Sequence, residues 1–252
     1  MKTTTSSALP HLTLCELGDP GIEGLESHSP FCLKVHRALR LAGLTYERRF
    51  GARPDSFKDL NATGQVPVLL VGSEPVSDST DILRRIEQLV PGSMVPEGAG
   101  PEVWLWEDFA DSVLNGYLVA ARWADERNWP VVKDVYFAAM PKVVRAIVPG
   151  RLRKGMIARL VARDVWRAGP EKCWRRFEST LDDLDARAPV TGYWLGAKAS
   201  AADVAIFAQL HGLRNELTAW QRDQIGRRVR LSSYLDRVHA LTSEISAVAQ
   251  AA

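Results

Sequence analysis

Hydrophobic positions in the first fifty residues change from a period of two to helical spacing and back. The alternating run 11–17 (HLTLCEL) predicts a buried strand. Between 31 and 42 apolar residues recur three and four apart, with Ser29 in N-cap position and Pro30 at the first helical position, which predicts a helix. A second alternating run at 45–50 (TYERRF) predicts a strand parallel to the first, so the three elements form a right-handed βαβ unit.

The next forty residues alternate between turn-rich and apolar composition. They predict a short irregular helix with a turn at 53–64 and an apolar strand at 65–71. A hairpin partner is predicted at 74–77 and a second helix at 80–89. Pro67 cannot donate to a sheet ladder, and a cis peptide bond after Val66 would accommodate it. Asp78 and Ser79 are N-cap candidates for the second helix.

A Pro- and Gly-rich segment at 91–101 divides the chain into two halves of different character. Beyond it strand signals end and helical periods take over, so the second half is expected to be all-α. Six helices are predicted there, at 102–127, 131–148, 152–167, 170–187, 201–213 and 231–243. Ser200 and Asp203 have the spacing of a capping box at the start of an apolar helix.

Composition narrows the class of protein. The chain has 252 residues with 46% hydrophobic and 25% charged residues, which is typical of a globular protein, and its net charge of +2 gives no general reason to expect nucleic acid. Cys15, Cys32 and Cys173 lack metal-ligand spacing, so we expect neither a metal site nor a disulfide framework, and a reducing compartment fits. The N-terminus has no apolar signal region, and we expect a cytoplasmic protein.

The most plausible chemistry lies at the start of the first helix. Ser29 and Cys32 form an S-x-x-C pattern, whose first position faces free N–H groups and the positive end of the helix dipole. A hydroxyl there can contact a thiolate, although serine is also a common N-cap. Cys32 lies one turn inside on the apolar face and is expected to be a buried, inert thiol. His28 can be a proton relay or a solvated loop side chain.

Two further segments have open alternatives. The connection 18–28 is long for a βα loop, and either folds over Ser29 or is a surface insertion. Segment 142–167 holds eight Lys or Arg residues against one Asp, interleaved with apolar residues. We expect a helix pair that packs its apolar residues inward, and the alternative is contact with an anionic membrane surface or an acidic partner.

The order of motifs resembles a known family over nearly the whole chain. The motifs are SPFCLKVHRALRLAGL, D-x-L-N-A-T-G-Q-V-P-V-L, V-S-D-S-T-D-I-L, a Pro/Gly linker and S-x-x-D-V-A-I-F. Together they resemble the cytosolic glutathione S-transferase superfamily. The long loop before SPFCLKV and the stretch ARWADERNW are similar to its metaxin-like or failed-axon-like branch.

This resemblance implies a fold and a set of site residues. A thioredoxin-like domain (βαβ-α-ββα) at 11–90, with four strands and three helices, would bind glutathione. A linker at 91–101 would lead to an all-helical substrate domain at 102–245. Ser29 would contact the glutathione sulfur. Val66, beside Pro67, would pair with the backbone of the cysteinyl residue of glutathione. Asp78 and Ser79 would bind the γ-glutamyl end, and Arg53 would bind the glycyl carboxylate. Ala62 departs from the proline frequent in the family, and the first strand lacks a catalytic tyrosine.

The resemblance also implies an activity. The expected reaction transfers the glutathione thiol to a hydrophobic electrophile or reduces a peroxide, in a homodimer. One or two of the aromatic residues of the first long helix of the second half are expected to line the substrate cleft, and these residues are Trp104, Trp106, Phe109, Tyr117 and Trp123. The alternatives are a non-catalytic binding or assembly module with this fold and a thiol reductase that acts through Cys32.

Overall fold

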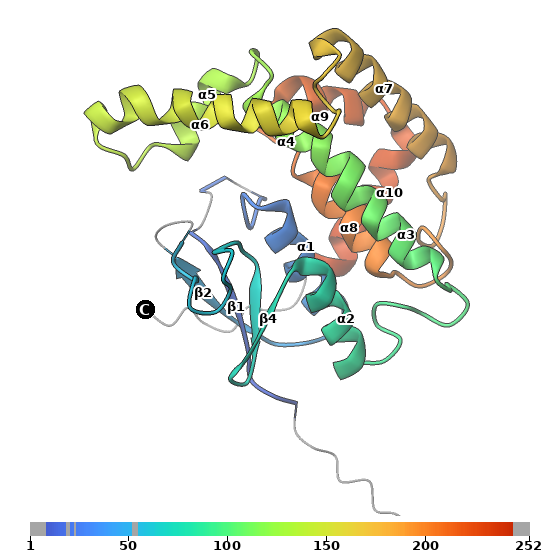
Figure 1. Ribbon diagram of the computed structural model, residues 1–252. Coiled ribbons are helices and arrows are strands. Elements are labelled where there is room, and N and C mark those ends of the chain that lie inside the picture. The colour runs from blue at the N-terminus through green and yellow to red at the C-terminus, as the bar shows by residue number, and fades with distance from the viewer. Residues whose placement is uncertain (1–8, 19–20, 23, 52–54, 244–252) are drawn as a thin grey trace, which may run out of the picture.

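The computed structural model describes residues 9–18, 21–22, 24–51 and 55–243. A four-stranded sheet with two helices forms the N-terminal part, and the remaining helices form a second layer beside it (Figure 1). The fold is therefore α/β followed by all-α, as the sequence predicts. Arg53, one of the predicted ligand contacts, lies outside the described residues.

The sheet contains the four strands that the sequence predicts. Its members are β1 (Leu12–Leu17), β2 (Glu47–Gly51), β3 (Val68–Val71) and β4 (Glu74–Ser77), arranged in the order β2-β1-β3-β4. β1 and β2 are parallel, as predicted, whereas β3 is antiparallel to both β1 and β4. The Val66–Pro67 peptide bond is cis, also as predicted, and precedes β3.

Helix α1 (Pro30–Leu41) is buried more completely than its amphipathic pattern suggests. Its apolar side packs on the sheet, and its other side packs against helices of the second layer. Lys34, His36 and Arg37 are consequently buried, although spacing places two of them on a polar face. Arg37 Nη2 donates to both carboxylate oxygens of Glu26, at 2.6 and 2.8 Å. Arg37 also donates to the Thr242 hydroxyl of the helical layer at 3.3 Å, so this polar residue of α1 joins the two layers.

One predicted element of this part is absent from the described residues. The segment 55–60 forms hydrogen-bonded turns and no helix, so the N-terminal layer has two described helices, α1 and α2 (Ser79–Leu89). The turns pack Phe57 into a small cluster with Cys15 and Val68. A single buried side chain anchors this segment without the longer apolar stripe that a stable helix needs.

The second layer is all-helical, as predicted. Its elements are α3 (Glu102–Phe109), the π-helical turn η1 (Ala110–Leu114), α4 (Asn115–Trp123), α5 (Trp129–Tyr136), α6 (Lys142–Ala162), α7 (Gly169–Arg187), α8 (Ala201–His211), η2 (Glu216–Thr218), α9 (Ala219–Gly226) and α10 (Val229–Ser243). The sequence prediction missed η2 and α9. The capping box of α8 is present, and Asp203 accepts hydrogen bonds from Ser200, Trp194 and Tyr234.

Helix α6 contradicts the prediction of a helix pair. It runs without interruption through Pro149, where the sequence suggested a break. Pro149 is buried, so its packing offsets part of the cost of the backbone hydrogen bond that proline removes. Val143 and Ile147 do not pack inward, because they are 77% and 68% exposed. No helix among the described residues has the length and apolar character to cross a bilayer.

Candidate functional site

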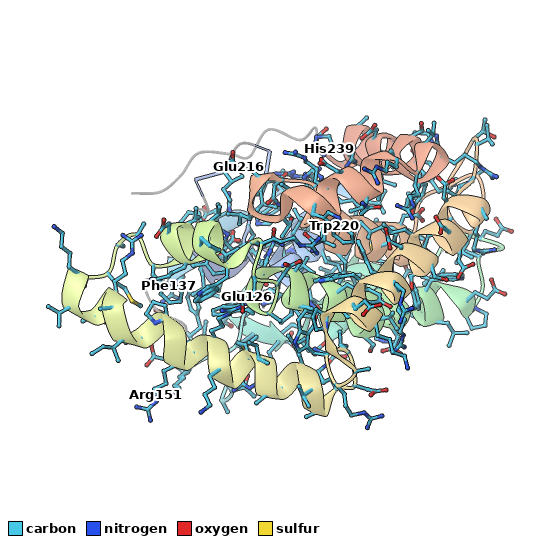
Figure 2. The ribbon with its side chains drawn as sticks, turned by 90° about the horizontal axis from the view of Figure 1, so that it is seen from above. Glu126, Phe137, Arg151, Glu216, Trp220 and His239 are labelled. Atoms are coloured by element: carbon cyan, nitrogen blue, oxygen red, sulfur yellow. The ribbon has the colours of Figure 1, made fainter. Side chains whose placement is uncertain are left out.

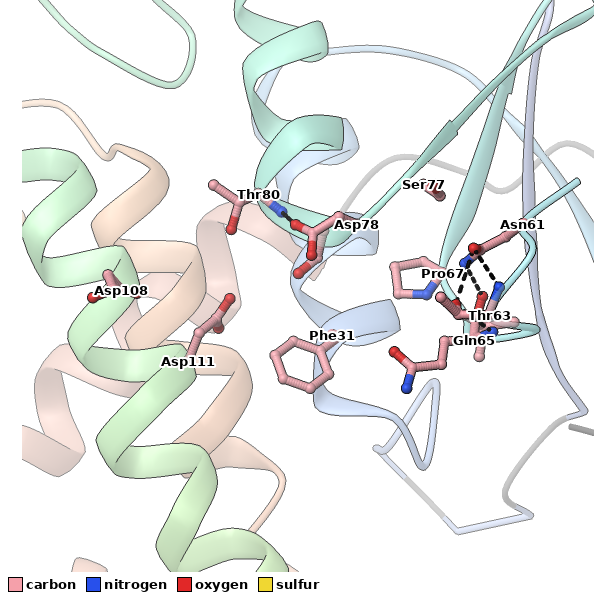
Figure 3. Close-up of a pocket in the computed structure, with 12 residues that line it drawn as sticks. Phe31, Asn61, Thr63, Gln65, Pro67, Ser77, Asp78, Thr80, Asp108 and Asp111 are labelled. Atoms are coloured by element: carbon pink, nitrogen blue, oxygen red, sulfur yellow. Dashed lines mark hydrogen bonds between the residues drawn. The ribbon is translucent and has the colours of Figure 1, made fainter. Parts of the chain in front are cut away.

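A cavity of about 430 Å³ lies where the start of α2 meets the helical layer (Figure 3). Asp78, Ser79 and Thr80 line it from the N-terminus of α2, and Asp108 and Asp111 line it from α3 and η1. The N-terminal N–H groups and the helix dipole favour a carboxylate at this end of α2. The three carboxylates favour a cation. The cavity therefore offers complementary charge to an α-amino-acid group, which carries one ammonium and one carboxylate.

Asp78 is both the N-cap of α2 and an exposed member of this cavity. One of its carboxylate oxygens accepts a hydrogen bond of 2.9 Å from the Thr80 N–H. Its backbone has φ 75°, a left-handed value that is uncommon outside glycine and costs about 1–3 kcal/mol. Such strain is concentrated at functional sites. An N-cap residue usually has extended backbone, so capping alone does not require the positive φ of Asp78. This backbone conformation holds the Asp78 carboxylate at the cavity.

Ser29 lines a second, larger cavity of about 600 Å³. It is the N-cap of α1, and its hydroxyl oxygen accepts a hydrogen bond of 3.3 Å from the Cys32 N–H. Lys58 and Arg159 also line this cavity, the latter from α6. None of the described residues of the 18–28 loop lines it. The described part of that loop is instead held on α1 and α8, where Leu25 packs against Leu33 and Ala208.

The two cavities share one wall. Phe31, Thr63, Gln65 and Val66 line both, and Pro67 lines the first. The backbone at Val66 thus lies between the α-amino-acid cavity and the cavity that contains Ser29. An extended peptide-like molecule that fills both cavities would pass this backbone, which can pair with an extended chain.

A buried cluster of charged groups lies at the side of the first cavity that faces the helical layer. Lys34 is fully buried and forms ion pairs with Glu107, at 2.6 Å between Nζ and Oε1, and with Asp111. The Thr80 hydroxyl donates to the same Glu107 oxygen at 2.7 Å, and the Gln209 amide donates to Asp111. Two carboxylates therefore share one ammonium. Asp111 belongs to η1, and π-helical turns of this kind occur frequently at functional sites.

The pKa of Asp111 is raised to about 6, because burial disfavours its charged form and Lys34 offsets this only in part. The neighbouring Glu107 raises the pKa further. A raised pKa means that the folded state holds a proton that the unfolded state has released, at pH values between the two pKa values. This group therefore favours folding at about pH 4, and its contribution is lost as the pH rises through about 6.

We expect Asp111→Asn to remove this pH dependence. The wild-type protein should gain about 1–3 kcal/mol of unfolding free energy relative to the variant as the pH falls from about 7 to 4. Urea unfolding of both proteins at a series of pH values measures this difference. Asp108→Asn is the control, because Asp108 is an exposed carboxylate of the same cavity. A wild-type-to-variant difference that does not change with pH would contradict the prediction.

Cys32 does not have the surroundings of a redox-active cysteine. It is fully buried, and burial together with the nearby Glu16 raises the pKa of its thiol to about 12. A protonated, inaccessible thiol is a poor nucleophile. The structure therefore supports the inert interpretation and not a reductase acting through Cys32. His28 packs edge-on against Tyr136 with ring centroids 4.6 Å apart, and it lines neither cavity.

The structure brings most of the predicted contact residues to these two cavities. Val66, Pro67, Asp78 and Ser79 line the first cavity, and Ser29 lines the second. Sequence reasoning missed the acidic residues Asp108 and Asp111, which lie three residues apart on a helix and come from the other layer. Their spacing is a visible signal, but only the packing of η1 beside α1 shows which cavity they line. Of the aromatic residues considered for the substrate cleft, Trp123 lines an apolar groove on α4 and α6.

Comparison with known proteins agrees with this architecture. Residues 28–89 match the glutathione S-transferase N-terminal domain, and residues 151–237 match the glutathione S-transferase C-terminal domain. The structure is similar to the beta-etherase LigF from Sphingobium sp. strain SYK-6, with 20% identity, a TM-score of 0.61 and coverage of 91% of this chain and 95% of that one.

A glutathione transferase family member from Pseudomonas fluorescens Pf-5, with two glutathione bound, is 16% identical with a TM-score of 0.60, and coverage is 93% of this chain and 91% of that one. A glutathione S-transferase from Methylobacillus flagellatus KT with glutathione bound is 17% identical with a TM-score of 0.54, and coverage is 92% and 97%. The fold is thus a thioredoxin-like layer followed by a helical domain. The chain belongs to the glutathione S-transferase superfamily.

Proposed function

We propose that the protein binds reduced glutathione and transfers its thiol to a hydrophobic electrophile. The observation that carries this proposal is the charge arrangement of the first cavity. The N-terminus of α2 would bind the γ-glutamyl carboxylate with Ser79, while Asp78 and the carboxylates of η1 and α3 would bind the ammonium. Such a cavity suits the zwitterionic end of glutathione better than a neutral or singly charged group.

The rest of glutathione would extend past Val66 into the second cavity. There the cysteinyl sulfur would lie beside the Ser29 hydroxyl. The family resemblance assigns the glycyl carboxylate to Arg53, and Lys58 is a further cation in the described part of this cavity. Residues of one chain line both cavities.

Ser29 would act by donating a hydrogen bond to the sulfur, which favours the thiolate over the thiol. In conjugation the thiolate forms a bond to an electrophilic carbon, and the leaving group departs with its electron pair. In peroxide reduction, the alternative within this class, two thiols become a disulfide while the O–O bond breaks to give an alcohol and water. Leu17, Phe31 and Val66 supply the apolar lining that a hydrophobic electrophile would contact.

Three broader features complete the proposal. A homodimer is typical of the family, and composition favours a cytoplasmic location. The resemblance to the metaxin-like or failed-axon-like branch stays a prediction. The boundaries 11–90, 91–101 and 102–245 are proposed as the two domains and their linker.

The test of binding uses Asp78→Asn. Asparagine is as good an N-cap as aspartate and tolerates left-handed backbone, so this change removes the charge and keeps the helix start. Hydrogen bonds to charged groups contribute about 1.5–3 kcal/mol, so we expect glutathione affinity to fall by about 10–150-fold. Isothermal titration calorimetry with reduced glutathione measures this change.

Asp81→Asn is the matched control, because Asp81 lies in the first turn of the same helix and does not line the cavity. It should bind glutathione with nearly wild-type affinity. The absence of any heat with the wild-type protein at millimolar glutathione would overturn the proposed function. Equal loss in both variants would show that α2, and not the Asp78 carboxylate, carries the effect.

A further inference from the structure

Helix α6 extends beyond the helices around it. In Figures 1 and 2 its N-terminal half projects past the rest of the helical layer, and Arg151 points outward from it. The proposed glutathione site lies elsewhere, since α6 contributes only Arg159, from its second half, to the two cavities. The outer face of α6 is therefore a separate feature that needs its own explanation.

This outer face exposes aliphatic side chains. Val143 and Ile147 are 77% and 68% exposed, and Val144 is 41% exposed. An apolar groove of about 450 Å³ adjoins them on α4 and α6, and Ile147 lines it together with Trp123, Leu152 and Met156 among others. Single exposed aliphatic residues are ordinary, whereas a group of them beside an apolar groove marks an interaction surface.

The same helix is rich in cations. Helix α6 contains six Lys or Arg residues and no acidic residue. Arg145 and Arg153 form ion pairs with Asp134 and Glu126, and both of these pairs lie within the chain. Arg151 and Lys154 are exposed and form no ion pair or hydrogen bond with the residues that the structure describes.

Helical geometry aligns these two kinds of residue. Val143, Ile147, Arg151 and Lys154 follow one another at intervals of four, four and three residues, so they form one line along the helix. Aliphatic side chains occupy its first half, and the cations Arg151 and Lys154 occupy its second half. This line spans about 17 Å at 1.5 Å per residue.

We propose that the outer face of α6 docks on an anionic lipid surface. Arg151 and Lys154 would contact lipid phosphates and carboxylates, while Val143 and Ile147 would enter the boundary between headgroups and acyl chains. A helix that lies in the plane of the interface uses this combination of cations and apolar residues. The proposal goes beyond glutathione chemistry and does not depend on it.

Charge and chemistry argue against two other occupants. If the same face of a second copy packed on this one, four unpaired cations would come together without acidic partners on α6. A nucleic acid would satisfy the cations through its phosphates, but it offers no apolar environment for Val143 and Ile147. An anionic bilayer satisfies both kinds of residue.

The test is co-sedimentation of the full chain with vesicles. Phosphatidylcholine vesicles that contain phosphatidylserine should bind the protein, pure phosphatidylcholine vesicles should not, and added salt should weaken binding. Arg151→Gln with Lys154→Gln should reduce partitioning by roughly tenfold or more, because each removed cation weakens attraction to the surface. Val143→Ser with Ile147→Ser should also reduce it, although it leaves the charge unchanged.

Lys172→Gln with Arg175→Gln is the control, because it removes the same charge from the exposed side of α7. This variant should bind vesicles as the wild type does. Equal loss in the control, or equal binding to both kinds of vesicle, would overturn the proposal. It would also be overturned if the α6 variants bound vesicles normally but changed a dimer into a monomer by light scattering, since the face would then join two copies.

Discussion

Ser29→Ala should lower kcat/KM for conjugation of glutathione to an electrophile by about 10–1,000-fold, which corresponds to about 1.4–4 kcal/mol of transition-state stabilisation. The hydroxyl lines the second cavity at the N-terminus of α1, where it can donate to sulfur. Alanine removes that donor and leaves the thiol closer to its ordinary pKa, so less thiolate is present at neutral pH. Steady-state kinetics with a chromogenic aryl halide measure the loss.

Two further variants and a stability measurement make this prediction specific. Ser29→Thr keeps the hydroxyl and should retain much more activity than Ser29→Ala. Thermal unfolding separates catalysis from folding, because losing the N-cap costs about 0.5–2 kcal/mol by itself. Cys32→Ser should remain active, since Cys32 is buried and lines neither cavity. Full activity in Ser29→Ala combined with loss in Cys32→Ser would reverse the roles of the two residues.

Lys34→Met should destabilise the protein by about 3–5 kcal/mol. The methionine fits the apolar part of the lysine side chain but leaves Glu107 and Asp111 buried beside each other without a shared cation. For a chain of this size the loss should lower Tm by about 6–20 °C. Differential scanning fluorimetry measures the shift. The ion pairs join α1 to α3 and η1, so the contact between the two layers should weaken first.

Two comparisons test the cause of that loss. Lys172→Met removes an exposed lysine from α7 and should change stability by no more than about 0.5 kcal/mol. Adding Glu107→Gln and Asp111→Asn to Lys34→Met should recover part of the lost stability, because the uncompensated buried charges are then gone. If the triple variant is less stable than Lys34→Met alone, hydrogen bonding and not charge accounts for the role of Lys34.

Local sequence rules determined much of the fold. The period of two at 11–17, the helical spacing after Pro30 and the capping box at Ser200 depend on neighbours in sequence, and each element is present. The same rules placed Ser29 and Asp78 at helix starts, where both are N-caps. These signals are readable because capping and periodicity are properties of short segments.

Tertiary structure alone decided the environment of the charged residues. Lys34 has the spacing of a polar position, yet it is buried because a second layer covers that side of α1. Asp111 lies 77 residues further along the chain and reaches the proposed site only through packing against Lys34.

Helix α6 shows the opposite effect. Its apolar residues suggested a buried face, but no element of the described part of the chain packs over Val143 and Ile147, which are exposed. Periodicity reports which residues share a face of a helix, and it contains no information about what covers that face. For this protein the sequence therefore determined the secondary-structure elements and their caps. The packing of the two layers decided which charged residues are buried, how the pKa of Asp111 is shifted and which face of α6 is exposed to solvent.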